Sequence, residues 1–263
     1  MSEWKSEKPV YIYCPECGDK AWIKDAHNLH HKDSDVDSVD IHGVTVCADF
    51  INVSEESVLV KIIDTHKPWT PSQEGRNKQD YGPRVSFLKQ KVSVGDFAGF
   101  PDYAVDLFGR MQERCDSLLG DFVPVEFCIL EYTPERGSYI RPHFDDKWIW
   151  GDRLLTVNLL SETNLRLTRE FNMPPYEIII RMPARSLLVL RGSARYDWHH
   201  SIRRYDIKAR RIALTWRNFS KDFLRDEYYK DFVAEVTNRA SQVIDTSCSG
   251  FIVRQLDKEI ETS

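Results

Sequence analysis

The feature that most constrains the fold is a series of short apolar segments between residues 125 and 217. Polar or turn-forming residues separate each segment from the next, and few helices are expected between them. Strand candidates with this length and spacing are typical of sandwiches and jelly rolls. We therefore expect an α+β fold that is mainly β, with strands at 125–132, 154–160, 164–169, 176–181, 186–190 and 211–217.

Two helices are expected before this series. The first covers about 55–66, with Ser54 as its N-cap, and the second covers about 103–119. In both, apolar residues recur at helical spacing, which predicts one buried face on each helix. We expect the two helices to pack on one side of a sheet as supports, without chemistry of their own.

The net charge of −5 argues against a dedicated nucleic-acid binder, because such proteins bind largely by neutralising phosphates. The charge is uneven, however, since residues 31–40 are acidic and 203–211 are strongly basic. A local basic surface is therefore compatible with the composition. No segment approaches the roughly 18 apolar residues of a membrane span, and the polar N-terminus does not resemble a signal peptide. We expect a soluble intracellular protein.

Residues 1–40 contain a Cys-x-x-Cys-Gly sequence and an acidic, serine-containing stretch that we expect to be a flexible linker. Cys14 and Cys17 have the spacing of two ligands in a zinc knuckle, so a structural zinc site is one interpretation. The alternative is a turn with reduced thiols and no metal. A zinc site would need further ligands from the nearby histidines, which are His27, His30 and His31.

Two further segments flank the expected core. Residues 69–91 form a polar loop with aromatic and basic side chains, which is either plain surface or a segment that holds a substrate. Residues 221–263 form a charged tail with a partly helical pattern. The tail either covers an edge of the domain or ends in about a dozen disordered residues.

One motif within the strand series carries chemistry. His143 and Asp145 are two residues apart, and in an extended segment such side chains point to the same face. They can therefore share a metal ion. A third ligand from later in the chain would complete the two-histidine, one-carboxylate triad of non-haem Fe(II) oxygenases. His199 and His200 are adjacent, so at most one of them can point to such a metal.

Two arginines share one face of the strand expected at 211–217. Arg211 and Arg217 alternate there with an apolar set on the opposite face. Their Cα atoms would lie about 20 Å apart, and both side chains are long enough to contact the two ends of a small dicarboxylate. The alternative is a pair of solvated arginines.

This order of residues resembles the AlkB family of Fe(II)- and 2-oxoglutarate-dependent dioxygenases, and within it the fourth animal homologue. The resemblance covers about residues 41–219 and is carried by long matches. The matching segments are 76–83 (RNKQDYGP), 132–138 (YTPERGS), 142–146 with Trp148 and Trp150, 183–190 (PARSLLVL), and Arg210 with Arg211.

The resemblance implies that residues 41–220 form a double-stranded β-helix with supporting helices on one side. It implies O2 as a cosubstrate, and Fe(II) held by His143, Asp145 and His200, because the family's His-x-Ile pattern falls on 200–202. It also implies a 2-oxoglutarate site, with side chains from Tyr132, Arg211 and Arg217.

The family's reaction is oxidative removal of an N-methyl group, and the resemblance leaves two substrates open. One is N6-methyladenine in DNA, with the base flipped out or single-stranded, and the other is methylated lysine in a protein such as actin. The basic stretches favour DNA and the overall acidity favours a peptide; we weigh local charge above net charge. Either substrate fits a protein of the nucleus and cytoplasm. The expected substrate contacts are Arg76, Lys78, Gln79, Tyr81, Asp146 and Trp148.

Overall fold

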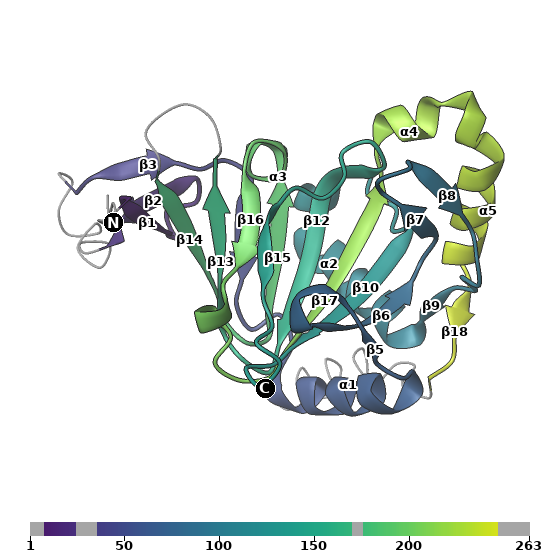
Figure 1. Ribbon diagram of the computed structural model, residues 1–263, viewed down its shortest axis with the longest axis horizontal. Coiled ribbons are helices and arrows are strands. Elements are labelled where there is room, and N and C mark those ends of the chain that lie inside the picture. Colours follow the sequence, from purple (N-terminus) through teal and green to yellow (C-terminus); the bar gives the residue numbers. More distant parts are fainter. Residues whose placement is uncertain (1–7, 25–35, 170–175, 247–263) are drawn as a thin grey trace, which may run out of the picture.

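Two seven-stranded sheets face each other across the centre of the molecule (Figure 1). The structure is a computed structural model that describes residues 8–24, 36–169 and 176–246. Sheet A has the strand order β11 (Ile140–His143), β16 (His199–Ile202), β13 (Thr163–Thr168), β14 (Glu177–Met182), β1 (Val10–Tyr13), β2 (Lys20–Ile23) and β3 (Ser38–Asp40). Sheet B has the order β4 (Val44–Cys47), β15 (Ser186–Arg191), β12 (Trp150–Leu159), β17 (Arg211–Phe219), β10 (Glu126–Tyr132), β6 (Asn77–Tyr81) and β5 (Thr70–Pro71).

Smaller elements surround the two sheets. Two short strand pairs are β7 (Arg84–Ser86) with β8 (Lys91–Ser93), and β9 (Phe100–Pro101) with β18 (Val243–Ile244). The α-helices are α1 (Val53–His66), α2 (Asp102–Leu119), α3 (Gly192–Tyr196), α4 (Lys221–Arg225) and α5 (Lys230–Ala240). Single 3₁₀ turns occur at Gln73–Gly75, Arg204–Asp206 and Glu227–Tyr229.

Two apolar cores separate three layers. One core lies between the sheets and contains residues of both, such as Leu165 and Ile180 from sheet A and Leu188 from sheet B. The other core lies on the opposite face of sheet B, where α1, α2 and α5 contribute buried residues, among them Leu107 and Val236. The expectation of a mainly β fold with supporting helices on one side is therefore confirmed.

Strand β17 shows how alternation divides these cores. Ile212 and Leu214 are fully buried in the core beneath the helices, whereas Ala213 belongs to the core between the sheets. Arg211 and Arg217 have the same parity as Ala213, so they face the space between the sheets. The predicted shared face of the two arginines is confirmed, and that face is the one that carries the candidate site.

The N-cap of α1 is Asn52, whereas the sequence pattern predicted Ser54. The Asn52 side chain accepts a hydrogen bond of 2.9 Å from the Glu55 backbone N–H, and the Glu55 carboxylate accepts one of 2.8 Å from the Asn52 N–H. This reciprocal pair is a capping box. Glu55 also accepts a hydrogen bond of 2.6 Å from the buried Arg110 of α2, so the start of α1 is bound to the second helix.

Asn52→Ala is expected to lower the free energy of unfolding by about 1 kcal/mol, because the Glu55 N–H loses its acceptor. Ser54→Ala is the matched control, and we expect it to change the free energy far less. Urea unfolding of both variants, followed by circular dichroism, measures the difference. An equal loss in the two variants would contradict the assignment of the cap.

The described residues near the N-terminus add strands to sheet A. Strand β1 pairs in parallel with β14, from Val10 opposite Glu177, and β2 and β3 extend sheet A beyond it. The end of the expected flexible linker, Ser38–Asp40, is therefore the edge strand of this sheet at the left of Figure 1. Strand β3 pairs with the nearby β2, but the pairing of β1 with β14 that joins all three strands to sheet A could not be predicted from a local charge pattern, because Val10 and Glu177 are far apart in the chain.

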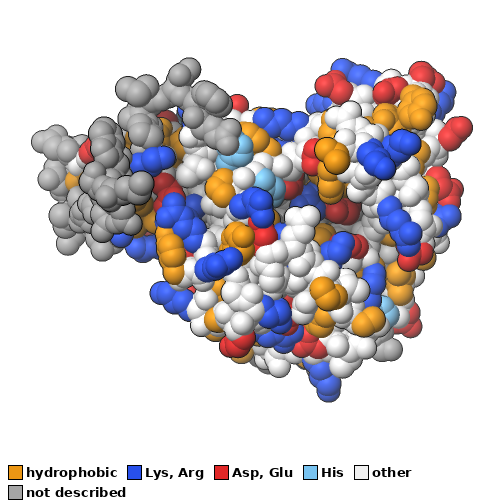
Figure 2. Space-filling model, viewed as in Figure 1, with side chains coloured by type: hydrophobic (Ala, Val, Ile, Leu, Met, Phe, Trp, Pro, Cys, Tyr) orange, Lys and Arg blue, Asp and Glu red, His pale blue; other side chains and the backbone are white. Residues whose placement is uncertain are grey.

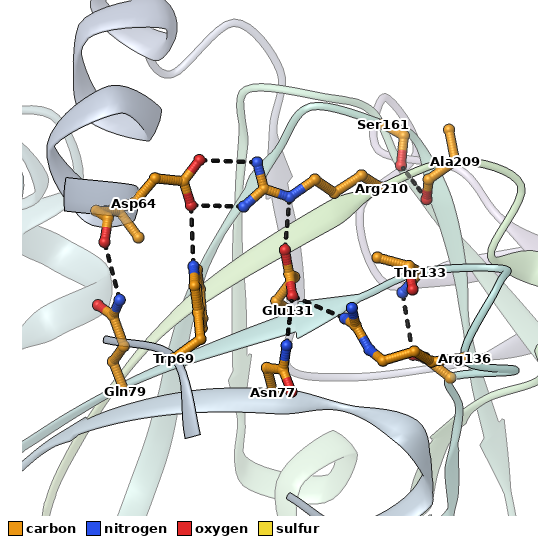
Figure 3. A network of polar contacts seen from close by, with 12 residues as sticks. Asp64, Trp69, Asn77, Gln79, Glu131, Thr133, Arg136, Ser161, Ala209 and Arg210 are labelled. Carbon is orange, nitrogen blue, oxygen red and sulfur yellow. Dashed lines mark hydrogen bonds and ion pairs between the residues drawn. The ribbon is translucent and has the colours of Figure 1, made fainter. Parts of the chain in front are cut away.

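The expected polar loop at 69–91 contains strands. Within it, β6 pairs antiparallel with β10, with Asn77 opposite Glu131. The strand is polar because its side chains have polar partners. The Asn77 amide donates to the Glu131 carboxylate at 2.9 Å (Figure 3), and Gln79 donates to the Ile63 and Lys67 carbonyl oxygens at 2.8 and 2.6 Å. Gln79 thereby binds the end of α1 to the sheet.

The first part of the C-terminal tail forms helices that pack on the domain. Helices α4 and α5 lie at the right of Figure 1, and Val236 of α5 is fully buried in the core that also contains the helix-facing residues of sheet B. Residues 247–263, which include the expected disordered end, lie outside the described residues. In the described part of the chain, the helices are all too short or too polar to span a membrane.

Candidate metal and cosubstrate site

Three side chains converge at the edge of sheet A that faces sheet B. His143 ends β11 and lies opposite His200 of β16 in the register of the two strands. Asp145 follows β11, and its Oδ1 lies 3.5 Å from the His143 Nε2 and 3.9 Å from the His200 Nε2. Candidate ligand atoms of all three lie within 4.8 Å of one another, and no other such group of three occurs in the described part of the chain.

The two residues predicted to share a metal ion do lie together. Strand β11 ends at His143, and Asp145 lies in the irregular segment that follows, with its Oδ1 3.5 Å from the His143 Nε2. The choice between the two adjacent histidines follows the expected alternation. His200 joins the cluster, whereas the ring centre of His199 lies 3.9 Å from that of Phe144.

The charges around the cluster suit metal binding. Burial alone would raise the pKa of Asp145, but Arg217 and the two histidines hold that pKa well below its usual range. Burial and the neighbouring His143 lower the pKa of His200 to about 3. Asp145 is therefore ionised and His200 neutral at physiological pH, and these are the protonation states that a metal ligand requires.

Arg217 connects this cluster to sheet B. Its Nε donates to the Asp145 Oδ2 at 2.7 Å, and its Nη1 donates to the Glu126 Oε2 at 2.6 Å. Burial raises the pKa of Glu126, and Arg217 opposes that shift. The sequence pattern did not identify Glu126, because it is the first residue of its strand and only the pairing of β10 with β17 places it opposite Arg217.

Arg211 lies at the other end of the same strand face. Its side chain is 2% exposed, its Nε donates to the Asn158 Oδ1 at 2.6 Å, and its guanidinium carbon lies 4.8 Å from the centre of the Tyr132 ring. Its Nη1 is buried and has no hydrogen-bond partner in the described structure. A buried guanidinium N–H without a partner is costly, so this position fits a ligand carboxylate.

The residues present therefore fit both groups that the resemblance implies. Two imidazoles and a carboxylate are the donor set of a non-haem iron site. Arg211 offers a buried, unpartnered donor for a carboxylate between the same two sheets. Asn158, which the sequence analysis missed, is buried opposite Ala213 in the register of β12 with β17. A lone asparagine within the apolar segment 154–160 was the one signal that could have identified it.

The cluster opens onto a cavity of about 1100 Å³. His143, Asp145, Asp146 and Arg217 line it from the side of the cluster. In the space-filling view, histidine side chains lie beside a hollow whose surroundings carry both basic and acidic side chains (Figure 2). The hollow is thus a mixed surface and not a purely basic one.

The side chains expected to contact a substrate have different positions. Arg76, Lys78, Gln79, Tyr81 and Asp146 all contribute to the cavity lining. Trp148 packs instead against the C-terminal segment, with its ring centre 5.7 Å from that of Phe223 and 6.5 Å from that of Tyr229.

The zinc interpretation of the N-terminus stays a prediction. Cys14 and Cys17 lie between β1 and β2 and form no disulfide within the described residues. The histidines that would complete the site, at 27, 30 and 31, lie outside the described residues.

Known proteins of similar sequence have names that agree with the iron and 2-oxoglutarate site described above. The chain is 39% identical over 248 residues to the alpha-ketoglutarate-dependent dioxygenase alkB homolog 4 of Mus musculus, covering 83% of this chain and 79% of the relative. It is 42% identical over 200 residues to the DNA N6-methyl adenine demethylase of Caenorhabditis elegans, covering 76% and 68%. No protein-family profile matches the chain.

A solved structure shares the fold. An oxidoreductase of the 2OG-Fe(II) oxygenase family from Burkholderia pseudomallei superposes with a TM-score of 0.51 at 11% identity, over 68% of this chain and 87% of that one. The solved structure shows that the fold is shared, and the relatives of similar sequence show the family. The chain belongs to the AlkB family of 2-oxoglutarate-dependent dioxygenases, which act with Fe(II), 2-oxoglutarate and O2.

Proposed function

We propose that the protein is an oxidative demethylase that removes the N-methyl group of N6-methyladenine in DNA, with formaldehyde and succinate as products. The observation that carries the proposal is the cluster of His143, Asp145 and His200 beside a large cavity, with Arg217 hydrogen-bonded to Asp145. The nematode relative, whose name gives this activity, supports the choice of substrate.

Each residue of the site has a role in this proposal. His143, Asp145 and His200 would hold the iron. Arg211 with Tyr132 and Asn158 would hold the distant carboxylate of 2-oxoglutarate, and Arg217 would contact the carboxylate near the metal. Iron bound there supplies the oxidising chemistry that hydroxylates the methyl group, after which the product loses formaldehyde. The protein orients the substrate and excludes water. Arg217 keeps the Asp145 carboxylate oriented through its 2.7 Å hydrogen bond.

The boundaries of the catalytic domain are part of the proposal. We infer that residues 41–220 form the dioxygenase domain as a double-stranded β-helix, with residues 69–91 on the substrate side. Support comes from the two facing sheets with the cluster between them, and from the fold shared with a 2OG-Fe(II) oxygenase. Residues 69–91 contribute β6 and the β7–β8 hairpin, whose Tyr81 and Phe87 line the cavity.

The surface at the cavity supports a DNA substrate. Arg84 and Arg141 line it, and their side chains are 70% and 71% exposed. Exposed arginines at such positions can contact phosphates on either side of the target nucleotide. The cavity volume of about 1100 Å³ can accept a base that is flipped out or single-stranded.

One observation favours methylated lysine in a protein as the second candidate. The basic side chains at the cavity are paired with acidic ones: Arg84 lies 2.8 Å from Asp96, and Lys78 lies 2.5 Å from Asp80. Such pairs leave less free positive charge for phosphates. They also agree with the net charge of −5, which suits a cationic peptide.

Formaldehyde release distinguishes N6-methyladenine in DNA from methyl-lysine in a protein as the substrate. With Fe(II), ascorbate and 2-oxoglutarate, we expect a single-stranded oligonucleotide containing N6-methyladenine to release formaldehyde well above the unmethylated oligonucleotide. A methyl-lysine peptide and its unmethylated form are the parallel pair. Release from the peptide alone, with the methylated DNA at background, would contradict the DNA proposal and establish the second candidate.

A further inference from the structure

Glu126 is a carboxylate of the cavity that neither the proposed iron site nor the 2-oxoglutarate site uses. It begins β10, lies opposite Arg217 in the register with β17, and its side chain lines the cavity. The chain leaves room for it at Gly82, where an added Cβ would lie 2.7 Å from the Glu126 Cγ. Any larger residue at position 82 would displace the carboxylate.

Arg217 holds Glu126 at a defined place relative to the metal ligands. One guanidinium donates to the Glu126 Oε2 at 2.6 Å and to the Asp145 Oδ2 at 2.7 Å. The two carboxylates are therefore the width of one guanidinium apart. Within the described structure, the side-chain hydrogen bond of Glu126 involves Oε2 and leaves Oε1 without one. The cavity thus contains an unused acceptor close to the metal ligand.

Two other acidic side chains of the cavity, Asp80 and Glu74, have contacts to both of their oxygens. Asp80 binds the Lys78 Nζ at 2.5 Å and lies 3.4 Å from the Cys128 Sγ. Glu74 accepts hydrogen bonds from the backbone and side chain of Arg141. Their oxygens are occupied by these contacts, whereas Glu126 has one occupied oxygen and one unused oxygen.

We infer that Glu126 determines substrate specificity by accepting a hydrogen bond from the N–H that adjoins the methyl group. This inference rests on the proposed function and narrows it to a substrate class: N-methyl groups on a nitrogen that still carries hydrogen. N6-methyladenine and monomethyl-lysine belong to this class. N6,N6-dimethyladenine and trimethyl-lysine do not, because their nitrogens carry no hydrogen. With such a substrate, the desolvated carboxylate would lack a donor, which disfavours binding.

Glu126→Gln tests the inference. Glutamine keeps the size of the side chain and can still accept from Arg217 through its carbonyl oxygen, but it then presents an NH₂ donor where Oε1 was an acceptor. We expect kcat/KM for single-stranded DNA with N6-methyladenine to fall about 10- to 100-fold relative to kcat/KM for DNA with N6,N6-dimethyladenine. The matched control is Asp80→Asn, a neighbouring cavity carboxylate, which should leave this ratio unchanged.

Two results would overturn the inference. The first is an equal loss of kcat/KM on both oligonucleotides with a raised KM for 2-oxoglutarate, because this indicates a structural effect through Arg217. The second is a Glu126→Gln variant in which the ratio of kcat/KM between the two oligonucleotides is unchanged. This result overturns the inference whether or not Asp146→Asn changes the same ratio. Monomethyl-lysine and trimethyl-lysine peptides are assayed in parallel. If only peptides release formaldehyde, the DNA proposal fails, and the ratio between the two peptides tests Glu126 in the same way.

Discussion

His143→Ala is expected to lower the Fe(II)-dependent conversion of 2-oxoglutarate to succinate by at least about 100-fold. Changes to groups that merely support a metal ligand already cost 10- to 100-fold in metal affinity or activity, so loss of a ligand should cost at least as much. His143 is one of three side chains whose ligand atoms lie within 4.8 Å of one another. The removal of one imidazole leaves two ligands, Asp145 and His200.

The matched control is His199→Ala, which removes the neighbour of His200 outside the cluster. Its ring contacts Phe144 and does not join the three ligands. Succinate is measured with Fe(II) and ascorbate in excess, and the melting temperature of each variant confirms that it is folded. Turnover in His143→Ala equal to that of the unmodified protein would refute the metal assignment, as would a loss confined to His199→Ala.

Arg211→Met is expected to raise the KM for 2-oxoglutarate by about 100-fold. Loss of one partner from a buried, hydrogen-bonded charge pair costs roughly 2–5 kcal/mol, and about 1.4 kcal/mol corresponds to a factor of ten. Arg211 is 2% exposed and its Nη1 has no partner in the described structure, so a carboxylate bound there would be fully desolvated. Methionine fills similar volume without the charge.

Arg210→Met is the control at the adjacent position. Its guanidinium points away from the site and binds Asp64 at 2.6 and 2.9 Å and Glu131 at 2.6 Å (Figure 3). We expect a lower melting temperature for this variant but no rise in the KM for 2-oxoglutarate. A similar rise in both variants would show that Arg211 acts through stability alone. Initial rates of succinate formation over a range of 2-oxoglutarate concentrations give the KM for 2-oxoglutarate of each variant.

The fold was predictable where periodicity is local. The strands from 125 to 217 and the two helices have their apolar residues at the spacings of a pleated strand and a helix, and these spacings need no knowledge of partners. Strand β6 was missed because its polar sequence, Asn77–Tyr81, has no apolar alternation. Its stability comes from hydrogen bonds to α1 and to Glu131, which are contacts between distant parts of the chain.

The candidate site was predictable in residue types and not in geometry. The pair His143 and Asp145 was identified from spacing, but β11 ends before Asp145, and the 3.5 Å distance between the carboxylate and the imidazole is known only from the structure. Neither Asn158 nor Glu126 belongs to a motif or spacing that would identify it from the sequence. Each lies opposite a residue of β17, so each becomes part of the site only through strand pairing.

By itself, the sequence determined which elements form and which side chains could bind iron and a dicarboxylate, because periodicity and residue chemistry are local properties. Only the tertiary structure decided which of these groups meet. The register of β11 with β16 brings His143 beside His200, and the pairing of β17 with β10 and β12 brings Arg217 to Glu126 and Arg211 to Asn158. The physical reason is that a buried charge needs a partner at hydrogen-bond distance, and the pairing of strands far apart in the sequence supplies it.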